Sequence, residues 1–70
     1  MRIDFQRVAM NIKAAGMSLS AASKRCGRNQ SWLQELARGD IRSVEFHDGL
    51  ALLDLHLDLV GVDRHREILK

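Results

Sequence analysis

The polar residues that could do chemistry in this chain gather in one short stretch, residues 28–34. Gln30, Ser31 and Gln34 have short hydrogen-bonding side chains, and Arg28 carries a guanidinium just ahead of them. Glutamine can pair with adenine, arginine can bind the O6 and N7 atoms of guanine, and serine can hydrogen-bond several bases. The stretch therefore carries side chains of the kind that read base edges, although an ordinary solvated face is the alternative interpretation.

A second group of residues could hold a phosphate backbone. Arg38 and Arg42 follow the first group, while Ser20 and Asn29 precede Gln30. Phosphate contacts position a protein on DNA, whereas base contacts give it specificity. We therefore expect Ser20, Asn29, Arg38 and Arg42 to bind phosphate or to position the base-reading residues. Solvated surface charge is the alternative for each arginine.

Other reactive residue types do not form a recognisable site. Positions 47, 56 and 65 carry the histidines, nine residues apart, whereas two histidines that bind one metal from a helix lie four apart. We expect His56 to be partly exposed and Cys26 to be a small core residue. The sequence predicts no catalytic residues, no metal or other cofactor and no small-molecule substrate.

Composition and charge point to one small domain, residues 1–70, with two unlike halves. Residues 1–42 contain eight basic and three acidic side chains, and residues 43–70 contain three basic and six acidic ones. A basic half suits a polyanion such as nucleic acid. One cysteine cannot form an intramolecular disulfide. Without an export signal or an apolar run of about 18 residues, we expect a cytoplasmic, nucleoid-associated protein and no membrane contact.

Glycines and capping residues divide the basic half into three short helices. Apolar residues recur every three or four positions in each, which is typical of a helix that buries one face. The expected helices are residues 5–15 after Asp4, residues 19–26 after Ser18 or Ser20, and residues 30–38 after Asn29. Gly16, Gly27 and Gly39 are expected to end them.

The second and third of these helices fit a helix-turn-helix. Two short helices that cross through a turn of 3–4 residues need a positive φ in the turn, which Gly27 can adopt. They also need a small side chain where they approach each other, and Ser23 is small. We expect Trp32 to pack rather than to contact DNA.

Residues 17–39 resemble the helix-turn-helix of the Cro and lambda-repressor-like family of phage and bacterial transcriptional regulators. The resemblance extends over about residues 5–59. It is carried by Met17-Ser18 at the start of the second helix, Gly27 in the turn, Asn29-Gln30-Ser31 at the start of the recognition helix, and Ala37-Arg38-Gly39 at its end. Arg28 departs from the family pattern, which has an apolar residue there.

The C-terminal part, residues 44–70, is predicted to contain further helix. Ser43 could cap a helix from Val44 to about Leu55, followed by a break and a short helix capped by Asp58. Residues 54–59 alternate strictly between polar and apolar side chains, so a short C-terminal strand is the alternative. The fold class expected is all-α, a compact domain of four or five helices.

The resemblance implies a sequence-specific regulator of transcription that binds double-stranded DNA, and we expect a phage or mobile-element repressor. One short recognition helix buries little surface, so we expect a homodimer on a palindromic operator. Its predicted interface is apolar: Leu55, Leu57, Leu59 and Val62. The alternative is a protein-interaction module that binds a host protein, suggested by the unusual Trp32 and Glu35 on the recognition helix.

Overall fold

The structure of the chain is a computed structural model that describes residues 3–68, without the side chains of Asp63, Arg64 and Glu67. Within this range it has four α-helices, one 3-10 helix and no β-strand, which confirms the predicted all-α class. The elements are α1 (Phe5–Ala14), α2 (Leu19–Arg25), α3 (Trp32–Arg38), α4 (Phe46–His65) and η1 (Arg66–Ile68).

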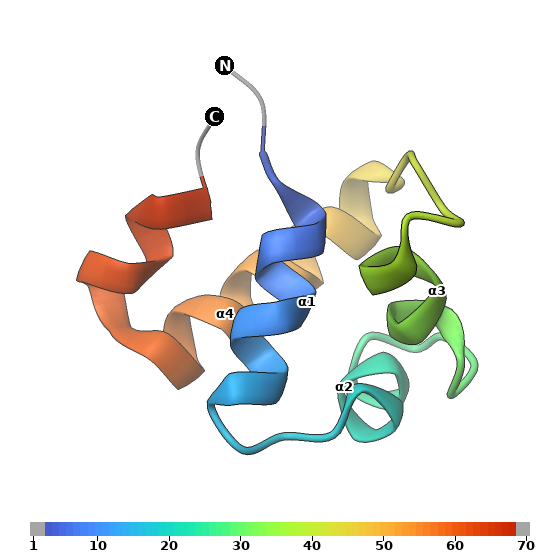
Figure 1. Ribbon diagram of the computed structural model, residues 1–70, viewed down its shortest axis with the longest axis horizontal. Helices are drawn as coiled ribbons and strands as arrows, with labels where there is room; N and C mark the ends of the chain where they lie inside the picture. The colour runs from blue at the N-terminus through green and yellow to red at the C-terminus, as the bar shows by residue number, and fades with distance from the viewer. Residues whose placement is uncertain (1–2, 69–70) are drawn as a thin grey trace.

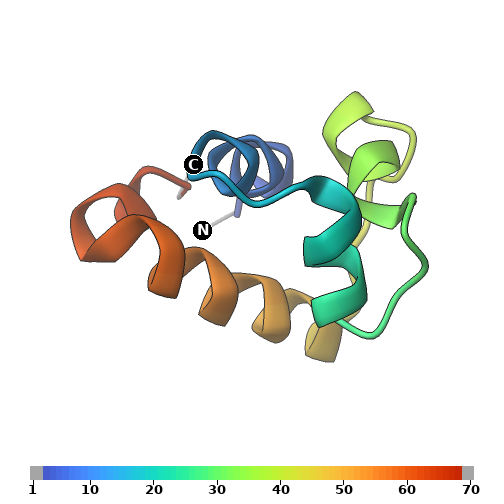
Figure 2. The same ribbon diagram turned by 90° about the horizontal axis from the view of Figure 1, so that it is seen from below.

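Helix α1 is the centre of the fold, because it packs against each of the other four elements (Figure 1). Helices α2 and α3 pack against each other at one end of the molecule. Helix α4 crosses behind α1, and the turn that leads into η1 lies at the opposite end (Figure 2). Helix α1 therefore lies between the surface formed by α2 and α3 and the C-terminal turn, which are separated along the direction of α4 (Figure 2).

The first two helices begin where the sequence predicts. Asp4 caps α1, since its Oδ1 accepts from the backbone N–H of Arg7 at 3.1 Å. Ser18 rather than Ser20 caps α2, and its Oγ accepts from the N–H of Ala21 at 3.1 Å. Each cap satisfies an N–H group that has no partner inside its own helix.

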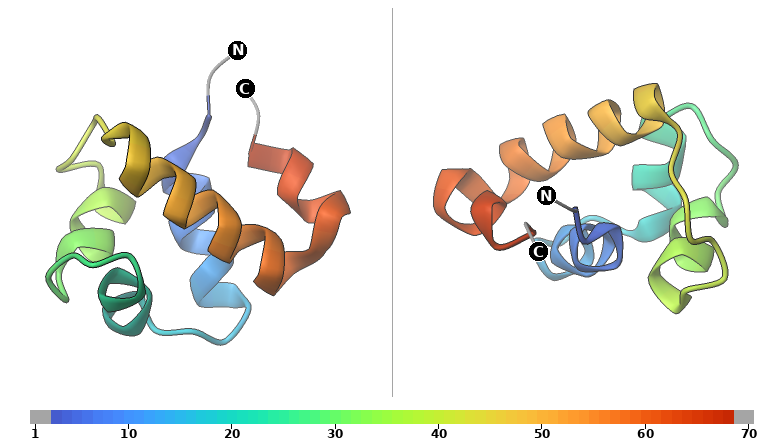
Figure 3. Two further views of the ribbon diagram at one scale, coloured as in Figure 1. Left: turned by 180° about the vertical axis from the view of Figure 1, so that it is seen from behind. Right: turned by 90° about the horizontal axis from the view of Figure 1, so that it is seen from above.

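Helix α4 differs from the prediction. It begins at Phe46, not Val44, so Ser43 does not cap it, and it runs without a break past Leu55. Figure 3 shows it as one long helix across the back of α1. The break comes at Gly61, whose φ of 82° and ψ of 169° are almost restricted to glycine. The alternative of a strand at residues 54–59 is wrong, because the alternating leucines lie on different sides of a helix.

Burial explains why those leucines alternate. Leu52 and Leu55 of α4 belong to the buried core, and Leu59 packs against it, whereas Leu57 is exposed. Trp32 is also buried, with 4% of its surface exposed, which confirms that it packs. The buried apolar residues come from all five elements: Val8, Ala9, Ile12, Ala22, Trp32, Leu33, Leu36, Leu52, Leu55 and Ile68.

Candidate nucleic-acid interface

A buried serine fixes the orientation of α3 relative to α2. The Oγ of Ser23 donates to the carbonyl of Leu19 at 2.8 Å and accepts from the N–H of Leu33 at 3.0 Å. Ser23 has no exposed surface, which confirms that a small residue is needed where the two helices meet. The start of α3 is therefore hydrogen-bonded to α2 rather than only packed against it.

The turn before α3 is longer than the sequence predicts. Gly27 has the expected positive φ, 75°, but α3 begins at Trp32 instead of directly after Asn29. The Oδ1 of Asn29 accepts from both the N–H and the Oγ of Ser31, at 3.0 and 2.8 Å. Such a local turn competes with helix formation, so Gln30 and Ser31 lie in the turn ahead of α3.

Arg28 is engaged by the protein itself. Its Nη1 lies 3.5 Å from Oδ2 of Asp48, the buried carboxylate in the first turn of α4. The guanidinium carbon lies 5.2 Å from the centroid of the Trp32 ring, within reach of a cation–π interaction. Arg28 was assigned to base reading from the sequence, and the structure places it as a link from the turn to α4.

Five polar residues line one hollow of about 470 Å³ between α1, α2 and α3: Lys13, Ser18, Ser20, Gln34 and Arg38. Ser20 comes from α2 and Gln34 and Arg38 from α3, so three of the residues predicted from the sequence come together here. Lys13, from the last turn of α1, was not predicted. In the sequence, Lys13 is marked only as a basic residue near the end of a helix. It reaches the hollow because α1 packs beside α2 and α3.

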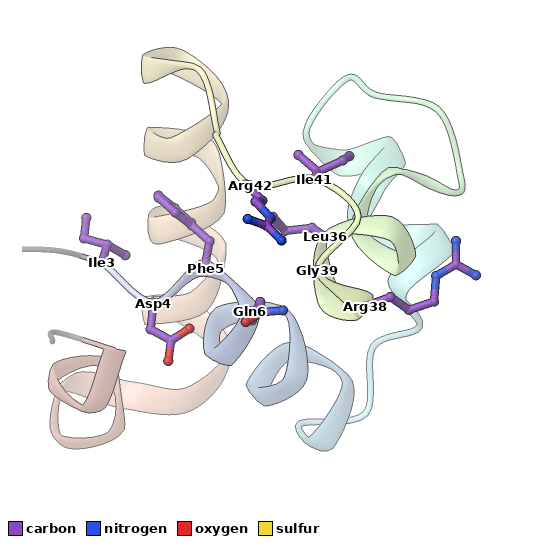
Figure 4. A pocket seen from close by; sticks show the side chains of 9 residues that line it. All are labelled: Ile3, Asp4, Phe5, Gln6, Leu36, Arg38, Gly39, Ile41 and Arg42. Carbon is purple, nitrogen blue, oxygen red and sulfur yellow. The ribbon is translucent and has the colours of Figure 1, made fainter.

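A second hollow of about 490 Å³ lies on the other side of Arg38, between the start of α1 and the loop after α3. Figure 4 shows the Arg42 side chain pointing between Phe5 and Leu36, while Arg38 points away from it. Arg38 also forms an exposed ion pair with Asp40, Nη2 to Oδ2 3.1 Å. Arg42 thus lines this second hollow and not the one shared by Lys13, Ser20 and Gln34.

The thiol of Cys26 is not activated. Burial first, and the negative charge of Asp48 second, raise the pKa of Cys26 above its ordinary value, against a smaller opposing effect of Arg25. A protonated thiol is a poor nucleophile and a poor metal ligand. Cys26 is half-buried and packs against the core.

One group of potential metal ligands is present among the described residues, although the sequence predicted none. Ligand atoms of Glu45, His47 and Asp48 lie within 4.8 Å of one another. The guanidinium of Arg28 already contacts the Asp48 carboxylate, and a positive charge at that carboxylate opposes the binding of a cation. We assign no metal to this group.

The residues predicted to form a dimer interface do not share one surface. Leu55 lies in the core with 6% exposure and Leu59 packs against the core, whereas Leu57 and Val62 are 38% and 59% exposed. Two further exposed apolar side chains, Phe46 and Leu50, precede them on α4. Phe46, Leu50 and Leu57 are spaced by four and seven residues, which places them on one side of the helix; we call these three the apolar row of α4.

Comparison of the chain with models of protein families, with curated proteins and with solved structures finds no match. In the part of the chain that the structure describes, none of the helices has the length and apolar character needed to cross a bilayer.

Proposed function

We propose that this protein is a transcriptional regulator that binds double-stranded DNA sequence-specifically through α3 and the turn before it. The observation that carries the proposal is the convergence of Lys13, Ser20, Gln34 and Arg38 around one hollow between α1, α2 and α3. Basic and short polar side chains on one surface suit a duplex, whose phosphates flank readable base edges. The resemblance of residues 17–39 to the Cro and lambda-repressor-like family supports the same function and favours a phage or mobile-element repressor acting in the cytoplasm.

In this proposal some exposed residues contact phosphates and others contact bases. Lys13 and Arg38 contact phosphates and set the register of α3 in the major groove. Gln34 contacts base edges from the exposed side of α3, and Gln30 and Ser31 contact them from the turn. Arg28 keeps the turn against α4, so its contribution to DNA binding is indirect.

A second copy of the chain completes the proposal. Seven residues of α3 offer a small contact with DNA, and two copies on a palindromic operator would double it. The apolar row of α4 is exposed and lies outside the hollow around Gln34. Pairing through this row would leave both α3 helices free for DNA.

A protein-interaction module remains the second candidate. Trp32 is buried, so it no longer supports a protein-binding face on α3. The apolar row of α4 is the observation that favours this candidate, because exposed apolar side chains that lie together often mark a protein interface. Both candidates use the apolar row, but only the first also binds DNA through α3 and the turn before it, so DNA binding separates them by experiment.

The test is selection of binding sites from a pool of random duplexes, followed by footprinting and titration of the enriched site in increasing salt. We expect enrichment of a palindrome. If each copy neutralises four to six phosphates, log K against log salt should slope by about −3.5 to −5.5 per copy. A pool without enrichment, together with a slope near zero on an unselected duplex, would overturn DNA binding and leave the protein-interaction module.

A further inference from the structure

The second hollow, of about 490 Å³, lies between the start of α1 and the loop that follows α3. Four apolar side chains line it. Leu36 is buried, and the other three are partly buried and pack against the core: Ile3, Phe5 and Ile41. Sites for small molecules typically have volumes of about 300–1,000 Å³ and apolar walls with a few placed polar groups. The hollow therefore has the size and the apolar walls of such a site.

Arg42 brings a positive charge between these walls. Figure 4 shows its side chain pointing between Phe5 and Leu36. Among the residues that the structure describes, none forms an ion pair or a hydrogen bond with its guanidinium. Arg38, by contrast, forms an ion pair with Asp40. Arg42 is exposed, so its five N–H donors are within reach of a molecule that enters the hollow from solvent.

Gln6 adds an amide donor from the opposite wall. Its side chain extends from the first turn of α1 towards Gly39 (Figure 4). The approach is close, because a Cβ on Gly39 would lie 2.9 Å from Nε2 of Gln6. Asp4, the acidic residue among the described lining residues, caps α1 and points away from Arg42 (Figure 4). Gln6 and Arg42 thus supply N–H donors from the two sides of the hollow.

We propose that this hollow binds a small organic carboxylate that has an apolar body. The planar guanidinium of Arg42 pairs with both carboxylate oxygens, and the Gln6 amide donates to one of them. The apolar body lies against Phe5, Leu36 and Ile41. A phosphate group also matches an arginine, but it would leave these apolar side chains uncovered. Charge and apolar walls together therefore select an anion with an apolar body.

The proposal gives Arg42 a different anion from the DNA phosphate predicted from the sequence. Leu36 and Arg38 belong to α3, so a molecule in this hollow would touch the helix proposed to read DNA. Binding of the carboxylate itself requires no DNA. The inference therefore stands or falls independently of the proposed function.

The experiment is an NMR titration of the full chain with 3-phenylpropionate at neutral pH and constant ionic strength. We expect saturable shifts of the Gly39 and Ile41 backbone amides and of the Gln6 side-chain amide, with a dissociation constant on the order of 1 mM or tighter. The amide 3-phenylpropanamide keeps the apolar body without the charge, and acetate keeps the charge without the body. Each should bind at least about tenfold more weakly, because each lacks one of the two interactions.

Arg42→Gln removes the charge from the hollow and leaves a polar side chain. Because Arg42 is exposed and has no described partner, the variant should fold normally. It should bind 3-phenylpropionate at least about tenfold more weakly, with little change for 3-phenylpropanamide. Arg25→Gln is the matched control, since Arg25 is exposed on α2 and lies outside this hollow. It should bind 3-phenylpropionate as the unaltered protein does.

Three results would each overturn the proposal: no saturable shifts at Gly39 and Ile41, equal affinity for the carboxylate and its amide, or unchanged affinity in Arg42→Gln. Titration with inorganic phosphate is the last arm. If phosphate shifts the same amides with equal or higher affinity, the apolar walls contribute nothing to binding. The proposal then fails, and contact with the DNA backbone becomes the better assignment for Arg42.

Discussion

At the first turn of α3, the backbone N–H of Leu33 donates to a side chain that belongs to another helix. Ser31 occupies the N-cap position of α3 but makes no capping hydrogen bond. The Oγ of Ser23 accepts from Leu33 in its place and donates to Leu19 within α2. A seven-residue helix has little intrinsic stability, so this bond from α2 supplies both capping and orientation.

Ser23→Ala tests this role. The substitution leaves the buried N–H of Leu33 without its acceptor, and we expect the free energy of unfolding to fall by about 1–2 kcal/mol. Urea unfolding followed by the fluorescence of Trp32 measures the change. Ser43→Ala removes an exposed serine that caps no helix, and should leave the midpoint unchanged. Equal midpoints for the two variants would contradict a capping role.

Gln34 and Arg28 should behave differently when each is replaced by alanine. Gln34→Ala should weaken binding to the selected operator by about 1–3 kcal/mol and hardly affect a scrambled duplex, as expected for a base-reading residue. Arg28→Ala removes a half-exposed ion pair and a cation–π contact, which together contribute about 1–2 kcal/mol of stability. It should weaken binding to both duplexes by the same amount. Titration of both variants with both duplexes distinguishes the two roles. If Arg28→Ala weakened only operator binding and Gln34→Ala weakened binding to both duplexes, the assignments of the two residues would be reversed.

Among the elements, those with local signals were predictable. The caps of α1 and α2 are set by Asp4 and Ser18 within three residues of their partners. The start of α3 was not predictable, because the Asn29 side chain accepts hydrogen bonds from Ser31, and the helix begins only after this turn. The alternation of polar and apolar residues in α4 is compatible with a strand. This pattern alone does not show that only one side of a helix packs against the core.

The candidate site was predictable where its residues share one helix, and not where tertiary packing assembles it. Gln34 and Arg38 follow from the helical spacing of α3. Lys13 joins them only because the end of α1 lies beside α2 and α3. His56 was expected to be partly exposed and is fully buried. Its burial was not predictable for the same reason, since its partner Asn11 is 45 positions away in the sequence.

The turn at Gly61 should not tolerate an L-residue. Its φ of 82° and ψ of 169° would cost an L-alanine about 1–3 kcal/mol, although nothing lies within 4 Å of the added Cβ. We therefore expect Gly61→Ala to lower the free energy of unfolding by this amount, measured in urea. A D-alanine introduced by chemical synthesis suits a positive φ and is the matched control. Equal stability of the two alanine isomers would contradict a conformational cause.

On the scale of the whole molecule, charge and apolar surface are divided between the helices. The basic residues that surround the candidate interface come from α1 and α3, whereas the exposed carboxylates Asp54 and Asp58 lie on α4. Negative charge on α4 would repel phosphate, so this helix is unsuited to lie against DNA. Its apolar row nevertheless exposes 79% of Phe46 and 49% of Leu50, which is the kind of surface that a second copy could cover.

Glutamate in the apolar row should separate the two copies while each remains folded. Leu50→Glu and Leu57→Glu place a charge where apolar contacts between copies are expected, and exposed positions usually change stability by less than about 0.5 kcal/mol. We expect monomers in sedimentation at micromolar concentration and much weaker operator binding, because two α3 helices about 34 Å apart, one turn of DNA, are needed for a palindrome. His47→Glu adds the same charge to α4 outside the row and should stay dimeric. If the unaltered protein sediments as a monomer and protects a single half-site, the apolar row does not join two copies, and a different protein becomes the better candidate to cover it.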